Sequence, residues 1–268
     1  MIIDFHTHCF PDALAPKAIK QLSEASGLTP STDGTLSGLK ALMKAQGVSA
    51  FVVNNIAATP RQQQKVNDFA ISVNGGGVVS FGSVNPYADN VFEEIERLKE
   101  NGISGVKFHP EYQGFYVDED FMLPIYKKLS REKLIVLFHA GWDIGYKPPY
   151  HGTPERFARI AEIFDTDVVL AHWGGSNMDR EVLETLCGLG YYFDTSFGKG
   201  YISPDSACEI VLRQGTSKIL FGSDSPWSTP EREVELIKSL NLGEKDEERI
   251  FSQNAVEILK KRGIILST

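Results

Sequence analysis

The chain has 268 residues, 42% of them hydrophobic, and its 27 basic and 35 acidic residues give a formal net charge of −8. This balance argues against a nucleic-acid partner, because phosphate binding requires a basic face. No run approaches the roughly 20 apolar residues of a membrane span. The N-terminal MIIDFHTHCF also lacks the basic start and apolar run of a signal peptide. We therefore expect a cytoplasmic protein with neither a membrane nor a nucleic-acid partner.

Three cysteines, Cys9, Cys187 and Cys208, show no C-x-x-C spacing. An odd number without such spacing favours free thiols in a reducing compartment. Cys9 directly follows His8, so it is either a soft metal ligand or a small residue packed at a strand end. The second interpretation is favoured.

Two kinds of segment alternate along the chain. Short runs rich in Val, Ile and Phe predict strands, and most are apolar on both faces, as parallel strands covered by helices are. Amphipathic stretches with capping residues predict the helices between them. The predicted strands span 2–6, 49–54, 77–84, 105–108, 134–139, 168–172, 191–195 and 218–222. The predicted helices span 14–25, 36–45, 61–73, 88–100, 119–131, 154–164, 179–189, 205–214, 230–240 and 246–262.

Eight strands alternating with helices predict an α/β fold, a single (β/α)₈ TIM barrel, with an open doubly wound sheet as the alternative. No linker or low-complexity tract divides the chain, so we expect one domain over residues 1–268. The longest gap between strands, residues 9–47, predicts an insertion after the first strand. Such a long connection is either a lid or specificity element or a neutral insertion.

Histidines gather where the predicted strands end. Five of the six lie at or just past a strand's C-terminal end, namely His6, His8, His109, His139 and His172. Asp224 ends the eighth strand in the same way. The C-terminal strand ends form the catalytic face of a (β/α)₈ barrel. We therefore expect these side chains to meet at one site.

Four of these side chains suit a metal. His6 and His8 are two apart on an extended segment and therefore share a face. His139 and Asp224 end apolar strands, and a buried carboxylate such as Asp224 needs a cation or a donor beside it. Three nitrogens and one oxygen match an open catalytic zinc site. The prediction is one Zn²⁺ per chain, with Mn²⁺ or another divalent ion also compatible.

Three further polar residues are expected at this face. His172 is either a ligand or a catalytic acid or base, and the catalytic role is favoured because four ligands are already present. Lys107 is either carbamylated and bridging two metals or, as favoured, paired with a barrel acid. His109 is expected to line the substrate pocket or to support the metal ligands.

Aromatic and basic residues complete the predicted substrate site. Trp142, Trp173 and Trp227 follow strand-end His139, His172 and Asp224 by one to three residues. They predict the walls of a substrate pocket, although simple packing is an equal alternative. Arg61 is the nearest candidate to hold a substrate carboxylate.

The combined motifs resemble the amidohydrolase superfamily, in the branch called amidohydrolase-related or amidohydrolase family 2. The motifs are IIDFHTH, FGSVNP, GVKFHPEYQGF, the strand-end His139 and His172, and LFGSDSPW. The resemblance implies a divalent metal, usually zinc, held by His6, His8, His139 and Asp224. It also implies that His172 acts beside the metal.

The resemblance implies a hydrolase that activates a metal-bound water to cleave an amide, ester or lactone of a small molecule. Asp224 would take the proton of the water, and His172 would stabilise the oxyanion. The alternative is a nonoxidative decarboxylase acting on a small aromatic or muconate-like acid, as in the related aminocarboxymuconate-semialdehyde decarboxylases. A non-catalytic metal-binding protein and a barrel phosphatase are less favoured, the phosphatase because no histidine follows Asp224 in SDSPW. Two barrels could also pair as a homodimer.

Overall fold

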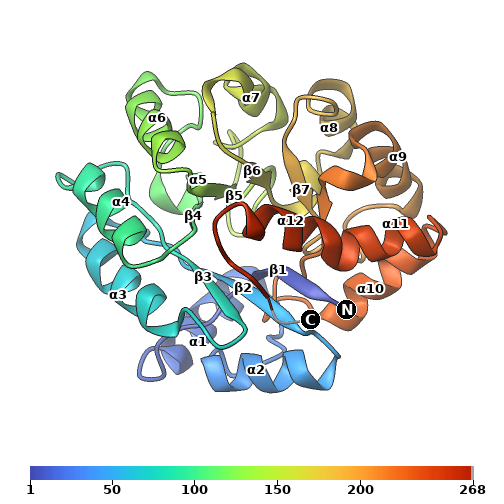
Figure 1. Ribbon diagram of the computed structural model, residues 1–268, viewed down its shortest axis with the longest axis horizontal. Helices are drawn as coiled ribbons and strands as arrows, with labels where there is room; N and C mark the ends of the chain where they lie inside the picture. The colour runs from blue at the N-terminus through green and yellow to red at the C-terminus, as the bar shows by residue number, and fades with distance from the viewer. Residues whose placement is uncertain (267–268) are drawn as a thin grey trace.

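A ring of eight strands surrounded by helices forms the molecule, here a computed structural model that describes residues 1–266 (Figure 1). Each strand falls at one of the eight predicted positions. They are β1 (Ile3–Thr7), β2 (Ala50–Asn54), β3 (Val78–Phe81), β4 (Gly105–Phe108), β5 (Ile135–Phe138), β6 (Val168–Leu170), β7 (Tyr192–Asp194) and β8 (Ile219–Leu220). All pairings between neighbouring strands are parallel.

Two short junctions close the ring. β1–β2–β3 and β4 to β8 form two continuous runs. The runs join at Gly82, whose N–H donates to the Gly105 carbonyl at 3.0 Å and whose carbonyl accepts from Lys107 N at 2.8 Å. On the other side, Phe5 N donates to the Phe221 carbonyl of the β8 segment at 2.8 Å. The sheet therefore closes on itself, which confirms the predicted (β/α)₈ barrel.

Apolar side chains fill the interior of the barrel and close one end of it. Alternate strand residues such as Phe5, Val52 and Leu137 form a buried cluster, which Ala255, Ile258 and Leu259 of α12 (Asn254–Lys260) join. Figure 1 shows α12 in red, lying across the strands on the side where both termini lie. With this end sealed, polar side chains can gather only at the opposite, C-terminal ends of the strands.

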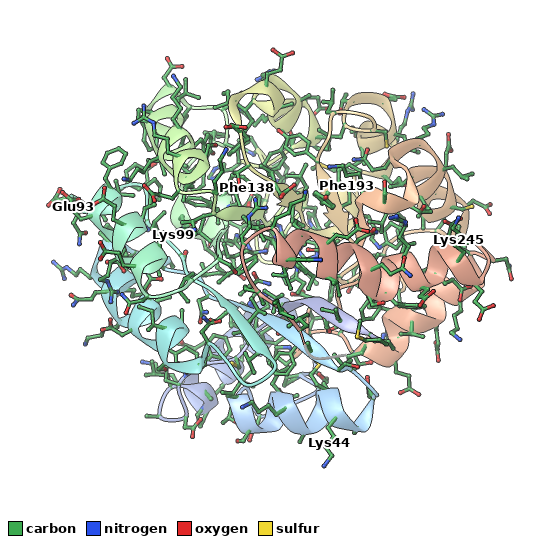
Figure 2. The ribbon with its side chains drawn as sticks, viewed as in Figure 1. Lys44, Glu93, Lys99, Phe138, Phe193 and Lys245 are labelled. Carbon is green, nitrogen blue, oxygen red and sulfur yellow. The ribbon has the colours of Figure 1, made fainter. Side chains whose placement is uncertain are left out.

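The outer layer consists of helices packed on the barrel, and Figure 2 shows Phe138 and Phe193 within the packed interior while Lys44, Glu93 and Lys245 stand at the periphery. None of the described helices is long and apolar enough to cross a membrane. The helices besides α12 are α1 (Ala15–Ser26), α2 (Leu36–Ala45), α3 (Gln63–Val73), α4 (Val91–Glu100), α5 (Pro110–Gln113), α6 (Leu123–Arg131), α7 (Pro154–Arg159), α8 (Asp179–Thr185), α9 (Pro204–Gln214), α10 (Pro230–Ser239) and α11 (Glu244–Glu248).

The predicted helix at 246–262 differs from the structure. A π-helical segment, Arg249–Gln253, separates α11 from α12. Within it the Ile250 carbonyl accepts a hydrogen bond from Phe221 N at 3.1 Å. The wider turn ties the last helical region to the β8 segment, a tertiary contact that helical periodicity does not reveal. The predicted insertion after the first strand is present and holds both α1 and α2.

Candidate active site

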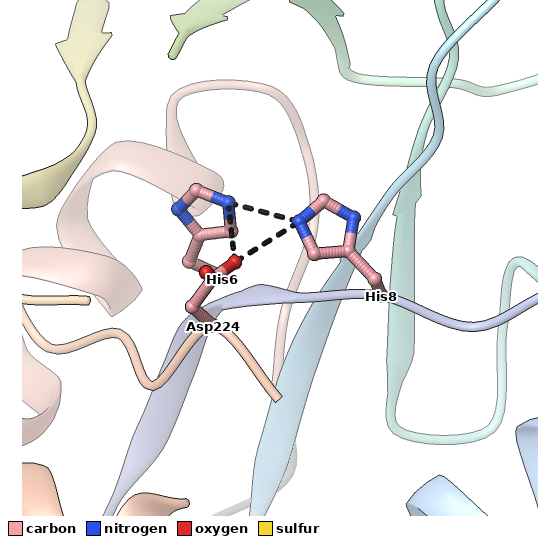
Figure 3. Close-up of side chains that lie close together, drawn as sticks. All are labelled: His6, His8 and Asp224. Carbon is pink, nitrogen blue, oxygen red and sulfur yellow. Dashed lines mark hydrogen bonds and ion pairs between the residues drawn. The ribbon is translucent and has the colours of Figure 1, made fainter. Parts of the chain in front are cut away.

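The first and last strands bring the predicted ligands together at the C-terminal end of the barrel. Asp224 N donates to the His6 carbonyl at 2.7 Å, and His8 N donates to the Ser225 carbonyl at 2.7 Å. These two backbone bonds fix Asp224 beside the His6-Thr7-His8 segment, although the residues are more than 200 positions apart in the sequence. Figure 3 shows the three side chains facing one another.

Three ligand atoms converge within this cluster. His6 Nε2 lies 3.2 Å from His8 Nε2 and 3.4 Å from Asp224 Oδ1, and His8 Nε2 lies 3.2 Å from Asp224 Oδ1. The side chains are between 1% and 12% exposed. Two atoms bound tetrahedrally to one ion at about 2.1 Å lie roughly 3.4 Å apart. The observed separations therefore suit a shared divalent ion.

Hydrogen bonds on the far side of each ring determine which nitrogen carries the proton. His6 Nδ1 lies 2.9 Å from Asp194 Oδ2, and His8 Nδ1 lies 2.8 Å from the Asn54 carbonyl. Both partners only accept, so both Nδ1 atoms donate and both Nε2 atoms turn a lone pair toward Asp224. Burial lowers the pKa of His6 to about 4, so His6 is neutral near pH 7. Facing lone pairs repel one another unless a cation lies between them, so this donor set fits a metal.

Asp224 is a carboxylate at neutral pH. Burial alone would raise its pKa, but the contacts with His8 and His6 oppose this and hold it at about 2. Only its Oδ1 contacts the two imidazoles. The side chain also lines the cavity described below.

Asp194, at the end of β7, was not predicted as a site residue. Besides binding His6, it accepts hydrogen bonds through Oδ1 from the backbone N–H groups of His172 and Ser196, both at 3.1 Å. It is fully buried and orients His6 in the way that carboxylates orient ligating histidines. A carboxylate ending an apolar strand was the signal used for Asp224, and the same signal was present here.

His139 and His172 form a pair beside the three-atom cluster. His172 Nε2 lies 3.1 Å from His139 Nδ1, and His172 Nδ1 lies 2.9 Å from the Ser196 hydroxyl. That hydroxyl donates to Asp194, so His172 Nδ1 donates and His172 Nε2 accepts. His139 Nε2 is buried and has no partner among the described residues. The structure thus gathers three of the four predicted ligands and places the fourth, His139, against His172, whose ring centroid lies 5.1 Å from that of His6.

Lys107 of β4 faces the same cluster. Its Nζ lies 3.3 Å from His6 Nε2, its residue exposure is 1%, and it forms no ion pair within the described residues. Burial lowers its pKa to about 8. The favoured expectation of an ion pair with a barrel acid is therefore wrong, because the nearest polar partner of the amine is an imidazole.

His109 lies in a stack of rings at the edge of the site. Its ring is 3.7 Å from that of Tyr112 and 4.1 Å from that of His139, centroid to centroid. Its Nε2 lies 3.2 Å from Asp143 Oδ2, a residue that was not predicted to be in the site. His109, His139 and Asp143 form a second group of close ligand atoms.

A cavity of about 950 Å³ opens over these side chains. Its wall includes His6, His8, His109, His139, His172 and Asp224, together with the predicted substrate residues Arg61, Trp142 and Trp227. Cys9 also borders it, but its sulfur belongs to none of the groups of close ligand atoms among the described residues, and burial raises the pKa of the thiol to about 12.

Trp173 is the exception among the predicted substrate residues. It is 2% exposed and belongs to the buried core outside the barrel, and it does not border the large cavity. Both His172 and Trp173 have positive φ, 58° and 63°. In this tight turn the imidazole faces the large cavity, and the indole packs behind it and borders a smaller pocket beside His172, so a substrate-binding role for Trp173 stays a prediction.

Comparison with known protein families supports the resemblance that the sequence motifs indicated. The family model described as Amidohydrolase matches residues 3–261. This chain belongs to the amidohydrolase family. The superfamily predicted from the motifs is therefore confirmed, whereas no curated protein sequence matches the chain.

Several solved structures share the fold at low sequence identity. An uncharacterised TIM-barrel protein from Bordetella bronchiseptica has a TM-score of 0.80 and 19% identity, covering 98% of this chain and 99% of its own. The 5-carboxyvanillate decarboxylase of Sphingomonas paucimobilis has a TM-score of 0.72 and 15% identity, covering 97% and 98%. A dihydroxybenzoic acid decarboxylase from Polaromonas sp. JS666, with bound manganese and the inhibitor 2-nitroresorcinol, has a TM-score of 0.70 and 14% identity, covering 97% and 96%.

Proposed function

We propose that this amidohydrolase-family enzyme is a metal-dependent nonoxidative decarboxylase of a carboxylic acid. The observation that carries the metal dependence is the convergence of His6 Nε2, His8 Nε2 and Asp224 Oδ1 within 3.4 Å. Decarboxylases of aromatic acids recur among the similar folds, which favours this alternative over the hydrolase predicted first. The ion is a divalent metal, and the Polaromonas protein supports manganese beside the predicted zinc.

In this proposal His6, His8 and Asp224 hold the ion and His139 is the fourth ligand, through a ring that has one buried nitrogen without a partner. When bound, the ion supplies a fixed positive charge that holds an oxygen of the substrate and stabilises negative charge beside it. The bond between the carboxyl carbon and the rest of the substrate breaks, and carbon dioxide leaves. The electron pair stays on the remaining carbon, which takes up one proton.

The proton is moved by residues of this chain. Asp224 lines the cavity and is a carboxylate at neutral pH, so it can receive a proton from the substrate or solvent and pass it to the carbon. His172 is held through Nδ1 by Ser196, so its Nε2 has a fixed direction beside the cluster. Its Nε2 accepts the hydrogen bond of His139 Nδ1, and burial lowers the pKa of His172, so a neutral His172 orients the ring of the proposed fourth ligand.

Hydrolysis of an amide, ester or lactone is the second candidate. Asp224 supports it, because this carboxylate lines the cavity and can take a proton from an attacking water. A decarboxylase instead needs a proton at the end of the reaction. The two candidates share one site and differ in the product.

The first experiment is elemental analysis of the wild type and His6→Ala after reloading with Mn²⁺ or Zn²⁺. About one ion per chain is expected in the wild type and little in the variant. The loaded protein is then offered 2,6-dihydroxybenzoate and 5-carboxyvanillate with detection of carbon dioxide, and a panel of esters and lactones. Carbon dioxide release that requires the metal supports decarboxylation, and purely hydrolytic products favour the second candidate. Wild type that binds no ion under any loading condition would contradict both.

A further inference from the structure

The outer part of the cavity is built by two helices rather than by strand ends. α1 contributes residues spaced by three or four positions, and α3 with the turn before it does the same, so each helix turns one face toward the cavity. The residues from α1 and its start are Leu14, Lys17, Ala18, Gln21 and Leu22, and those from the second segment are Arg61, Gln62, Lys65, Val66 and Phe69. In Figure 1 these helices are neighbours on one side of the barrel.

Basic side chains without acidic partners mark this outer part. Lys17, Arg61 and Lys65 are exposed, and none of them forms an ion pair with another described residue. The carboxylates in the wall of the cavity are Asp143 and Asp224, both on the strand-end loops. All three therefore keep an uncompensated positive charge beside the cavity, although the net charge of the chain is −8. They create a local positive potential that attracts an anion.

Apolar side chains also line the cavity, both after the strand ends and on the two helices. Phe10, Leu14, Ile56 and Val66 are among the apolar residues in the wall. The volume of about 950 Å³ lies near the upper end of the roughly 300–1,000 Å³ that pockets for drug-sized ligands span. An acid with a single aromatic ring would fill only a small part of it.

We propose that the substrate is an elongated, largely apolar carboxylic acid with a second anionic group at its far end. The reacting carboxylate lies at His6, His8 and Asp224, and the second anion lies between α1 and α3 at Lys17, Arg61 and Lys65. This assignment rests on the proposed function for the reacting end only. Arg61 suits a carboxylate or a phosphate equally well, because its planar guanidinium donates two parallel hydrogen bonds to either group.

The test is to measure by calorimetry how acids of increasing chain length bind to the metal-loaded protein. Linear diacids from hexanedioate to hexadecanedioate are compared with monoacids of the same length. A long diacid places one carboxylate at each end of the cavity, whereas a monoacid places only one. We expect the diacids to bind about fivefold more tightly than matched monoacids once the chain is long enough, with the gain lost in 0.5 M salt. An ω-phosphono acid of that length tests whether the far end prefers phosphate.

The variant for this test is the combined Lys17→Gln, Arg61→Gln and Lys65→Gln protein. The matched control is Lys20→Gln, since Lys20 lies on α1 but pairs with Glu24 and is not part of the cavity wall. The triple variant should lose the diacid advantage and keep the metal content and thermal midpoint of the wild type, and the control should keep the advantage.

The outcomes separate the two proposals. Equal binding of diacids and monoacids at every length, or an advantage that survives in the triple variant, would overturn the anion site at α1 and α3. A diacid advantage that is the same with and without metal would leave that site intact but count against the proposed metal-dependent reaction. If the wild type binds no metal, the contribution of the three basic residues can still be measured by comparing diacid binding to the metal-free wild type and the metal-free triple variant.

Discussion

At the inner end of the cavity, His6, His8 and Asp224 lie at strand ends, and their side chains are at most 12% exposed. At the outer end, by contrast, Lys17, Arg61 and Lys65 lie on two helical segments and are exposed. The inner groups are held by buried hydrogen bonds to Asp194 and the Asn54 carbonyl. The outer groups have no such support. The two ends of the cavity therefore differ in how precisely they can position a bound group. The strand ends can fix a metal and a proton, and the helices can select a substrate by charge and length without fixing its position closely.

The largest effect is expected for Asp224→Asn at the inner end. The substitution keeps the size of the side chain but removes the negative charge between the two imidazoles. We expect the bound metal to be lost and activity to fall about 10³-fold or more. Metal content per chain and kcat measure the two effects, and circular dichroism checks the fold.

The same substitution at Asp143 is the matched comparison. Asp143 also lines the cavity, but its side chain contacts His109 rather than the three-atom cluster. Asp143→Asn is therefore expected to keep about the wild-type metal content. Equal metal loss in both variants would show that the inner site extends beyond His6, His8 and Asp224.

Asp194→Asn tests whether the buried hydrogen bonds of Asp194 determine the metal affinity at the inner end of the cavity. Asp194 uses one oxygen for His6 Nδ1 and the other for backbone N–H groups of His172 and Ser196. An amide has only one accepting oxygen, so the variant must lose one of these sets of contacts. We expect metal affinity to fall about 10- to 100-fold, as for other residues that orient metal ligands.

The measurement is metal competition against a chromophoric chelator, with the thermal midpoint of the metal-free protein as control. A variant with weakened metal binding and a nearly unchanged apo midpoint would assign Asp194 a positioning role. An unchanged affinity would mean that His6 keeps its orientation without the carboxylate.

Glu233, from α10, connects the loops that follow β7 and β8, and it predicts a pH dependence of stability. It is 1% exposed and accepts hydrogen bonds from the Ser228 hydroxyl and the Gly198 and Lys199 N–H groups. Burial raises its pKa to about 7, although the hydrogen bonds oppose this. Between the unfolded pKa of about 4.3 and pH 7, the folded protein therefore holds a proton that the unfolded chain has released. The free energy of unfolding should fall as pH rises through this range.

We expect Glu233→Gln to reduce this fall by about 1–3 kcal/mol, since glutamine does not titrate. Asp4, whose pKa burial also raises to about 7, contributes in the same direction and should leave a residual slope. Urea unfolding at pH 5, 6 and 7 measures the difference, and Glu231→Gln on the exposed face of the same helix is the control. An identical slope in wild type and Glu233→Gln would contradict the raised pKa.

The fold and the inner site follow largely from local patterns. Apolar runs locate the eight strands, and the position of His6, His8, His139 and Asp224 at their ends follows directly. The contacts between side chains of different strands could not be predicted in this way, because they depend on how the barrel closes. The pairing of Asp194 with His6, and of His139 with His172, joins side chains 188 and 33 positions apart. Strand-end position alone does not determine which neighbours meet.

The direction of a side chain in a tight backbone turn could not be predicted from the local sequence pattern either. The sequence places Trp173 one residue after His172, which predicted a shared face. The positive φ values of both residues turn the indole into the core instead. Nothing in the local composition AHWGG distinguishes the two directions, because the choice depends on the space between β6, β7 and the surrounding helices.

The smallest effect is expected for Trp142→Leu, and its comparison with Trp173→Leu separates a cavity wall from a core residue. Trp142 borders the cavity and is partly buried, so its loss should weaken binding of a long-chain acid a few-fold with little change in the thermal midpoint. Trp173 is 2% exposed and packs in the core, so Trp173→Leu should lower stability by about 2–4 kcal/mol, a shift of several degrees for a domain of this size. Calorimetric Kd and scanning calorimetry give both values on the same samples. If Trp173→Leu weakened acid binding more than Trp142→Leu at an unchanged midpoint, the indole of Trp173 would belong to the substrate site after all, and the division between wall and core drawn here would fail at that position.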